Sequence, residues 1–155
     1  MFQRIVVPLD GTDLSARSLP YAVEMARKFS AELILVTAVQ PGRVVTSGVE
    51  GPGSVQILID SAQEKEALDR KEAVANLDAV ARDCERKGAR VTTAIVNGAP
   101  ADEILKLCRE RKADLVIMTT HGRSGIKRAV LGSVTDAIAR SNIVPVLMIR
   151  PELPA

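Results

Sequence analysis

A segment rich in glycine and hydroxyl side chains, residues 119–135, has the composition of an anion-binding loop. Its glycines would let backbone N–H groups approach an anion closely, and two hydroxyl side chains stand where a helix would begin. These residues are Gly122, Gly125, Gly132, Ser133 and Thr135. A phosphate group suits such a loop. The same glycines could instead serve a tight strand-to-helix turn, with Ser133 as an N-cap, and the local spacing does not separate the two interpretations.

The charged side chains of this segment do not point to catalysis. His121 is the only histidine and has no obvious nucleophile or second histidine as a partner, so loop hydrogen bonding or contact with a phosphate is favoured. Arg123, Lys127 and Arg128 could neutralise phosphate charge or form an ordinary solvated surface. The glycine spacing matches neither the P-loop of nucleoside triphosphatases nor the dinucleotide-binding fingerprint.

A second candidate group is Asp10, which directly follows an apolar run near the N-terminus. Its carboxylate could accept hydrogen bonds from two vicinal sugar hydroxyls, or it could be a turn or N-cap residue. In an open parallel sheet, ligands bind outside the carboxyl ends of the strands. A position just after a predicted strand is therefore compatible with a ligand site.

Five short apolar runs predict the strands that would position these residues: 5–9, 33–39, 91–96, 115–118 and 144–149. The runs are nearly continuous rather than alternating, which is typical of strands covered by helices on both faces. Helical patterns separate the runs, so the connections are predicted to be right-handed crossovers. The sequence therefore predicts an α/β fold: a single domain with an open five-stranded parallel sheet and helices on both faces.

The first helix is predicted over residues 14–29, with Thr12 or Asp13 as its N-cap and with a later start or a bend at Pro20. A stretch rich in glycine and proline, residues 40–54, is predicted to be a variable surface loop. Further helices are predicted over residues 55–87, from Pro100 onward, and over residues 133–140.

The composition disfavours several classes of partner. The chain has 155 residues, about one domain's worth, and its formal charge of +2 disfavours nucleic acid. Aromatic residues make up 2%, so a ligand is not expected to be held by ring stacking. Cys84 and Cys108 are predicted to be core residues, and with one histidine no zinc site of His and Cys is expected. Because no signal peptide or membrane-spanning run is apparent, we expect a soluble cytoplasmic protein that does not contact membranes.

Three stretches give the chain a specific resemblance: RIVVPLDGTDLSARSLPYAVEMA, NGAPADEILKLCRERKADLVIMTTHGRSG and VLGSVTDAIARSNIVPVLMIRP. They resemble the universal stress proteins, whose sheet is of the adenine nucleotide alpha hydrolase type. Nucleotide-binding members of that family carry G-x2-G-x9-G-[S/T] after the fourth strand. Gly122, Gly132 and Ser133 match this pattern, whereas Thr119 stands in place of its first glycine.

The resemblance implies the strand order 3-2-1-4-5 and an ATP site. Asp10 would bind the ribose hydroxyls, Pro8 would lie beside the base, and the backbone of Ala38 would pair with the adenine edge, among aliphatic residues such as Leu9 and Val96. The phosphates would be held by Thr119, His121, Gly122, Arg123, Ser124, Gly125, Gly132, Ser133, Val134 and Thr135. Mg²⁺ or Mn²⁺ would arrive with the phosphates rather than sit in a protein cage, so no metal ligand is predicted.

The implied function is regulatory: ATP binding in a stress response, with at most slow hydrolysis, because no general base or Walker-type lysine is in place and no residue is predicted to be catalytic. The strand at residues 144–149 would lie at the sheet edge and pair with a second copy in a homodimer. The alternative is a nucleotide-free dimeric scaffold, in which Thr119 marks the loss of the nucleotide site.

Overall fold

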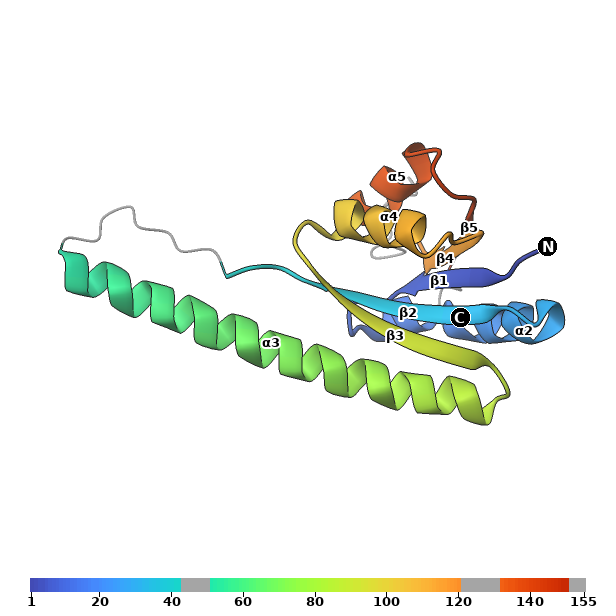
Figure 1. Cartoon of the computed structure of the whole chain (residues 1–155), viewed down its shortest axis with the longest axis horizontal. Helices are drawn as coiled ribbons and strands as arrows, with labels where there is room; N and C mark the ends of the chain where they lie inside the picture. Colours follow the sequence, from blue (N-terminus) through green and yellow to red (C-terminus); the bar gives the residue numbers. More distant parts are fainter. Residues whose placement is uncertain (43–50, 121–131, 151–155) are drawn as a thin grey trace, which may run out of the picture.

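Five parallel strands form one sheet in the order β3-β2-β1-β4-β5, which confirms the predicted fold and topology (Figure 1). The computed structural model describes residues 1–42, 51–120 and 132–150. The strands are β1 (Arg4–Pro8), β2 (Glu32–Val39), β3 (Arg90–Asn97), β4 (Leu115–Thr119) and β5 (Val146–Ile149). The helices are α1 (Asp13–Ala16), α2 (Leu19–Phe29), α3 (Pro52–Arg86), α4 (Pro100–Glu110) and α5 (Ser133–Arg140).

Apart from shifts of one residue at the ends of strands, the element bounds differ from the prediction in three places. The predicted helix over residues 14–29 is divided into α1 and α2, because Pro20 lies in the first turn of α2, where a residue without an N–H is tolerated. The predicted loop over residues 40–54 ends earlier, since α3 already begins at Pro52. The last strand begins after Pro145 rather than at residue 144. The other helices lie where the sequence predicted them.

The apolar runs form strands because both faces of the sheet are covered. Ile5, Val6 and Val7 of β1 have no exposed surface. Alternate side chains of a strand point to opposite faces, so Ile5 and Val7 join a core with α2 and α3 while Val6 joins a core with α4 and α5. The central strand is therefore buried on both faces and cannot itself present polar side chains to a ligand.

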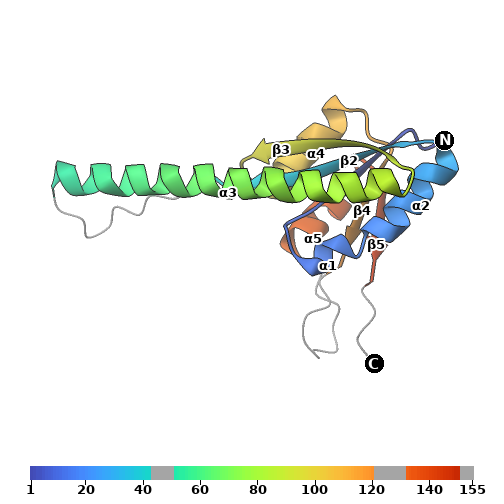
Figure 2. The same ribbon diagram turned by 90° about the horizontal axis from the view of Figure 1, so that it is seen from below.

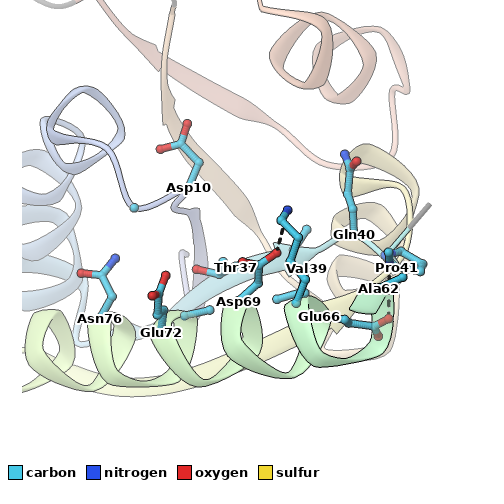
Figure 3. A pocket seen from close by; sticks show the side chains of 15 residues that line it. Asp10, Thr37, Val39, Gln40, Pro41, Ala62, Glu66, Asp69, Glu72 and Asn76 are labelled. Atoms are coloured by element: carbon cyan, nitrogen blue, oxygen red, sulfur yellow. Dashed lines mark hydrogen bonds and ion pairs between the residues drawn. The ribbon is translucent and has the colours of Figure 1, made fainter. Parts of the chain in front are cut away.

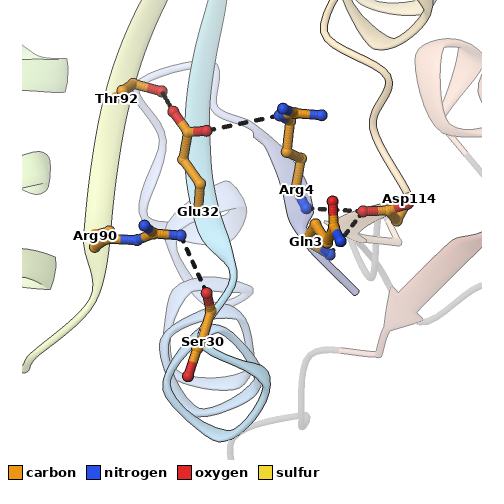
Figure 4. Close-up of polar contacts among 7 residues, drawn as sticks. All are labelled: Gln3, Arg4, Ser30, Glu32, Arg90, Thr92 and Asp114. Atoms are coloured by element: carbon orange, nitrogen blue, oxygen red, sulfur yellow. Dashed lines mark hydrogen bonds and ion pairs between the residues drawn. The ribbon is translucent and has the colours of Figure 1, made fainter. Parts of the chain in front are cut away.

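The amino ends of the strands are tied together by side-chain hydrogen bonds (Figure 4). Asp114, just before β4, accepts hydrogen bonds from the backbone N–H groups of Gln3 and Arg4 at 2.7 and 2.8 Å. These hydrogen bonds hold the pKa of Asp114 below its ordinary value. Between β2 and β3, the hydroxyl of Thr92 donates to Glu32 at 2.9 Å. The polar groups at this end of the sheet are thus engaged in holding strands together.

Helix α3 runs along one face of the sheet and then extends well beyond it (Figures 1 and 2). Among its side chains that the structure describes, only Leu77 and Cys84, each 1% exposed, are buried. Farther toward its N-terminus, Gly42 passes so close to the helix that an added Cβ would lie 2.6 Å from the carbonyl oxygen of Ala62. In the parts of the chain that the structure describes, no helix has the length and apolar character needed to cross a membrane.

The two cysteines are buried core residues and free thiols, as predicted. Cys84 packs in the core under α3, and Cys108 in the core under α4. Burial raises the pKa of both groups, that of Cys108 to about 11. Both residues are therefore protonated near neutral pH, which makes them poor nucleophiles and poor metal ligands.

We predict that Leu77→Ala destabilises the protein by about 2–5 kcal/mol, because truncating a buried leucine removes apolar burial and leaves a cavity. Leu68→Ala on the same helix is the matched control: Leu68 is 54% exposed, so its truncation should change the free energy of unfolding by less than about 0.5 kcal/mol. Urea unfolding followed by circular dichroism measures both. Equal losses in the two variants would mean that Leu77 does not anchor α3.

Candidate functional site

A cavity of about 160 Å³ opens at the carboxyl ends of β1, β2 and β4. The strand order reverses between β1 and β4, and this reversal leaves a crevice above the ends of the strands. The cavity is lined by Pro8, Leu9, Asp10, Leu14, Ser15, Val36, Ala38, Pro100, Ile104, Met118, Thr119, Val134 and Thr135. Six of the predicted site residues, from four separate parts of the chain, are thus brought together at the position expected for a ligand.

Other predicted residues stand apart from this cavity. Gly132 and Ser133 are at the start of α5, beside Val134 but not among the lining residues. Val96 is partly buried and packs against the core under α4, whereas Leu9 does line the cavity. The predicted site residues His121, Gly122, Arg123, Ser124 and Gly125 lie outside the described residues.

The backbone of Ala38 offers a donor and an acceptor at the mouth of the cavity. The carbonyl of Val36 accepts from the N–H of Leu9 at 2.8 Å, and the carbonyl of Val39 accepts from the N–H of Gly98 at 3.1 Å. Since successive residues of a strand direct their peptide groups to alternate neighbours, those of Ala38 point to the same side as those of Val36. On that side β1 has already ended, so the N–H and C=O of Ala38 face the cavity that this residue lines.

Asp10 lies immediately after β1 and is held by the start of α1. Thr12 is the N-cap of α1, and its hydroxyl accepts from the N–H of Ser15 at 3.2 Å. Thr12 also donates twice to one oxygen of Asp10, Oδ1, from its N–H at 3.0 Å and from its hydroxyl at 2.6 Å. Burial alone would raise the pKa of Asp10, but the hydrogen bonds, chiefly from Thr12, outweigh it and lower that pKa. The group is a carboxylate at neutral pH.

The start of α5 closes the other side of the cavity. Its N-cap is Gly132, so Ser133 is the first helical residue and does not cap the helix. Thr135 is 2% exposed, and its hydroxyl donates at 3.4 Å to the carbonyl of Thr119, which is itself 8% exposed. This long hydrogen bond joins the first turn of α5 to the end of β4. The free N–H groups of a helix's first turn carry partial positive charge, which favours an anion here.

A second, larger cavity of about 800 Å³ lies beside the first and shares Asp10 and Ala38 with it. Figure 3 shows Asp10 across from a row of α3 side chains, Glu66, Asp69, Glu72 and Asn76. Among the described residues that line it, the one cation is Lys65, whose Nζ lies 3.5 Å from Asp69. Among the described residues, no group of three or more Asp, Glu, His or Cys side chains could hold a metal ion. The described lining of this cavity is therefore mainly acidic.

The sequence did not predict this larger cavity, because its wall is α3, a helix with no motif in the sequence. From the sequence alone, these carboxylates are interpreted as an ordinary solvated helix face. Only the path of α3 past the end of β2 places that face opposite Asp10. The aliphatic lining residues Leu14, Ile104 and Met118 were also missed as site residues, since each belongs to a pattern that predicts core packing.

The parallel sheet with helices on both faces, and with a small cleft at the point of strand-order reversal, places this molecule in the open, doubly wound α/β class. The sequence profile of the Universal stress protein family matches residues 1–150, and the chain belongs to that family.

Individual relatives agree with this assignment. The chain is 32% identical over 151 residues to Universal stress protein YxiE of Bacillus subtilis, covering 97% of this chain and 100% of that protein. The structure of MJ0577 of Methanocaldococcus jannaschii has the same fold, with a TM-score of 0.79 at 23% identity over 99% of each chain. A universal stress protein solved in complex with cAMP matches with a TM-score of 0.60 at 29% identity, covering 96% of this chain and 97% of that one.

We predict that the carboxyl group of Asp10 titrates below its ordinary value of 3.8. Because the pKa is lowered in the folded state, the hydrogen bonds to the carboxylate stabilise the protein above the ordinary pKa, and this stabilisation is lost as the pH falls through the lowered value. An NMR titration of the side-chain carboxyl carbon measures the midpoint. In Thr12→Val the midpoint should rise toward 3.8, and an unchanged midpoint would rule out the Thr12 hydroxyl as a cause.

Proposed function

We propose that this protein binds an adenine nucleotide, ATP with Mg²⁺ or Mn²⁺, and works in the cytoplasm as a nucleotide-responsive regulatory module of a stress response, with at most slow hydrolysis. The observation that carries this proposal is the pair of polar features at one small apolar cavity: the backbone N–H and C=O of Ala38, and the carboxylate of Asp10. Adenine needs one donor and one acceptor on its edge, and a ribose diol needs an acceptor.

The aliphatic lining suits a flat base without ring stacking. Leu9, Val36, Ile104 and Met118 surround the space beside Ala38. A base that fills this space buries apolar surface and exchanges hydrogen bonds with backbone groups, which leaves specificity to shape and hydrogen bonding. The low aromatic content of the chain is compatible with this mode of binding.

The two neighbouring environments favour one direction for the phosphates. From a ribose at Asp10, one path leads into the acidic cavity along α3, where Glu66, Asp69 and Glu72 would repel a polyphosphate. The other path leads to the N-terminus of α5 at Ser133, where backbone N–H groups attract an anion. We therefore place the phosphates at Thr119, at Gly132, Ser133, Val134 and Thr135, and at the proposed loop residues His121, Gly122, Arg123, Ser124 and Gly125.

One relative supports the proposal independently of these contacts, since a universal stress protein of 29% identity was solved in complex with cAMP. The divalent ion is proposed to be held by the phosphates and water. It would supply charge neutralisation between the phosphate groups, while the chain's own residues hold the base, the ribose and the phosphate oxygens.

A nucleotide-free scaffold is the second candidate function, and one observation favours it. Thr119 replaces the first glycine of the nucleotide-binding motif, and its side chain is buried and lines the cavity. The cavity, at about 160 Å³, is smaller than the roughly 300–1,000 Å³ usual for ligand pockets. In this alternative the side chain of Thr119 prevents a nucleotide from entering.

We predict that one ATP binds per subunit in the presence of Mg²⁺, measured by calorimetry after any co-purified nucleotide has been released by denaturation and identified. Asp10→Asn should weaken binding about tenfold, because a hydrogen bond to a charged group contributes about 1.5–3 kcal/mol and 1.4 kcal/mol is a factor of about ten. Asp13→Asn, an exposed neighbour, is the control and should bind as the wild type does. No binding at millimolar ATP would favour the scaffold.

We also propose a homodimer through the edge strand β5. The carbonyl of Pro145 accepts from Val116 N of β4 at 2.9 Å, and that of Ile149 accepts from Thr120 N, just after β4, at 3.0 Å. Successive residues of a strand direct their N–H and C=O groups to alternate sides. Those of Met148, the residue before Ile149, therefore point away from β4, toward the free edge of the sheet. Leu147 and Met148 are 36% and 42% exposed there. An apolar edge with outward peptide groups suits pairing with a second copy.

We predict that Met148→Pro yields a monomer in sedimentation equilibrium, because proline removes the outward N–H while the hydrogen bonds to β4 remain. Met148→Val keeps that N–H and should remain a dimer. Circular dichroism verifies that both variants are folded. A dimer that survives Met148→Pro at micromolar concentration would place the interface elsewhere.

A further inference from the structure

The hydrogen bonds around Asp10 form a closed set that fixes the carboxylate. The backbone N–H of Asp10 donates to the hydroxyl of Ser15 at 3.3 Å, and that hydroxyl donates to the carbonyl of Thr12 at 2.9 Å. The hydroxyl of Thr12 accepts from the N–H of Ser15 and has a single proton, which it donates to Asp10. The N-cap of α1 and the orientation of Asp10 are therefore one arrangement.

Both donors from Thr12 end on the same oxygen. The N–H of Thr12 at 3.0 Å and its hydroxyl at 2.6 Å both donate to Oδ1 of the Asp10 carboxylate. The two oxygens of a free carboxylate are equivalent and exchange by rotation about the Cβ–Cγ bond. Here Thr12 removes that equivalence, so Oδ2 is the oxygen left to accept from a ligand.

We propose that Thr12 is a positioning residue for ribose recognition: by occupying Oδ1 it presents Oδ2 of Asp10 to the sugar hydroxyls, and so sets the preference for a ribonucleotide over an analogue without those hydroxyls. This inference rests on the proposed adenine-nucleotide function. Thr12 does not touch the ligand itself; it acts through the carboxylate, which lines the cavity.

The test compares ATP with 2′,3′-dideoxy-ATP, which carries the same base and phosphates but neither sugar hydroxyl. The dissociation constants of both are measured by calorimetry for the wild type, for Thr12→Val, which has the same shape without the hydroxyl, and for Thr12→Ser, which restores it. Thr92→Val is the matched control, because Thr92 also donates to a carboxylate, at 2.9 Å, but at the opposite end of the sheet.

We expect the wild type to bind ATP about tenfold more tightly than the dideoxy analogue, a difference equivalent to one charge-assisted hydrogen bond. Thr12→Val keeps the N–H donor at 3.0 Å but loses the hydroxyl donor at 2.6 Å, so this ratio should fall severalfold, with the affinity for the dideoxy analogue nearly unchanged. Thr12→Ser and Thr92→Val should keep the wild-type ratio. A general loss of folding would weaken both nucleotides together and leave the ratio intact, so the ratio separates positioning from a structural role.

If Thr12→Val does not fold, Thr12→Gly replaces it, because glycine is accepted at an N-cap and has no side-chain proton to donate to Asp10. The ratio of the two affinities remains the readout. A wild-type ratio in the variant that folds would overturn the role of Thr12, as would a ratio near one in the wild type. If the wild type binds neither nucleotide, the proposed function itself fails, which is a distinguishable result.

Discussion

The cleft depends on one constraint, which is that β1 ends before the strands on either side of it. Its last residue, Pro8, pairs with Val36, whereas β2 continues to Val39. On the other side β4 continues to Thr119, beyond the two residue pairs that it forms with β1. Backbone groups that lose their neighbouring strand still require partners. The staggered ends thus create both the space for a ligand and the peptide groups of Ala38 that would hydrogen-bond to it.

The two ends of the sheet carry opposite kinds of polar chemistry. At the amino ends, Asp114 and Glu32 are engaged with groups of neighbouring strands. At the carboxyl ends, Thr12 engages one oxygen of Asp10, and the N-terminus of α5 directs its N–H groups outward. The polar groups at the amino ends stabilise the sheet, whereas those at the carboxyl ends line or border the small cavity. The polar groups at the carboxyl ends of the strands are held by local turns, which leaves part of their hydrogen-bonding capacity free.

Helix α3 shows how an exposed element affects the site without a motif of its own. It is anchored near its C-terminus by Leu77 and Cys84, and its N-terminal part is supported by pairs one turn apart, such as Gln56 with Asp60 at 2.8 Å. Because the helix continues past the end of β2, its carboxylates face Asp10 across the larger cavity. A negative wall on that side makes the N-terminus of α5 the favourable direction for an anion.

The sequence by itself determined the strands, their burial on both faces and the order of elements, because continuous Val, Ile and Leu runs between helical patterns have few other solutions. Its resemblance to a family added the strand order and the candidate residues, of which Pro8, Asp10, Ala38, Thr119, Val134 and Thr135 line one cavity. Only the tertiary structure determined how these residues are oriented around the cavity. The direction of the Ala38 peptide groups follows from strand register, and the acidic wall follows from the path of α3. The commitment of one Asp10 oxygen to Thr12 follows from the turn into α1, where atoms two residues apart come within hydrogen-bonding distance. Strand register and helix path depend on contacts between distant segments, which no local pattern of residue types specifies.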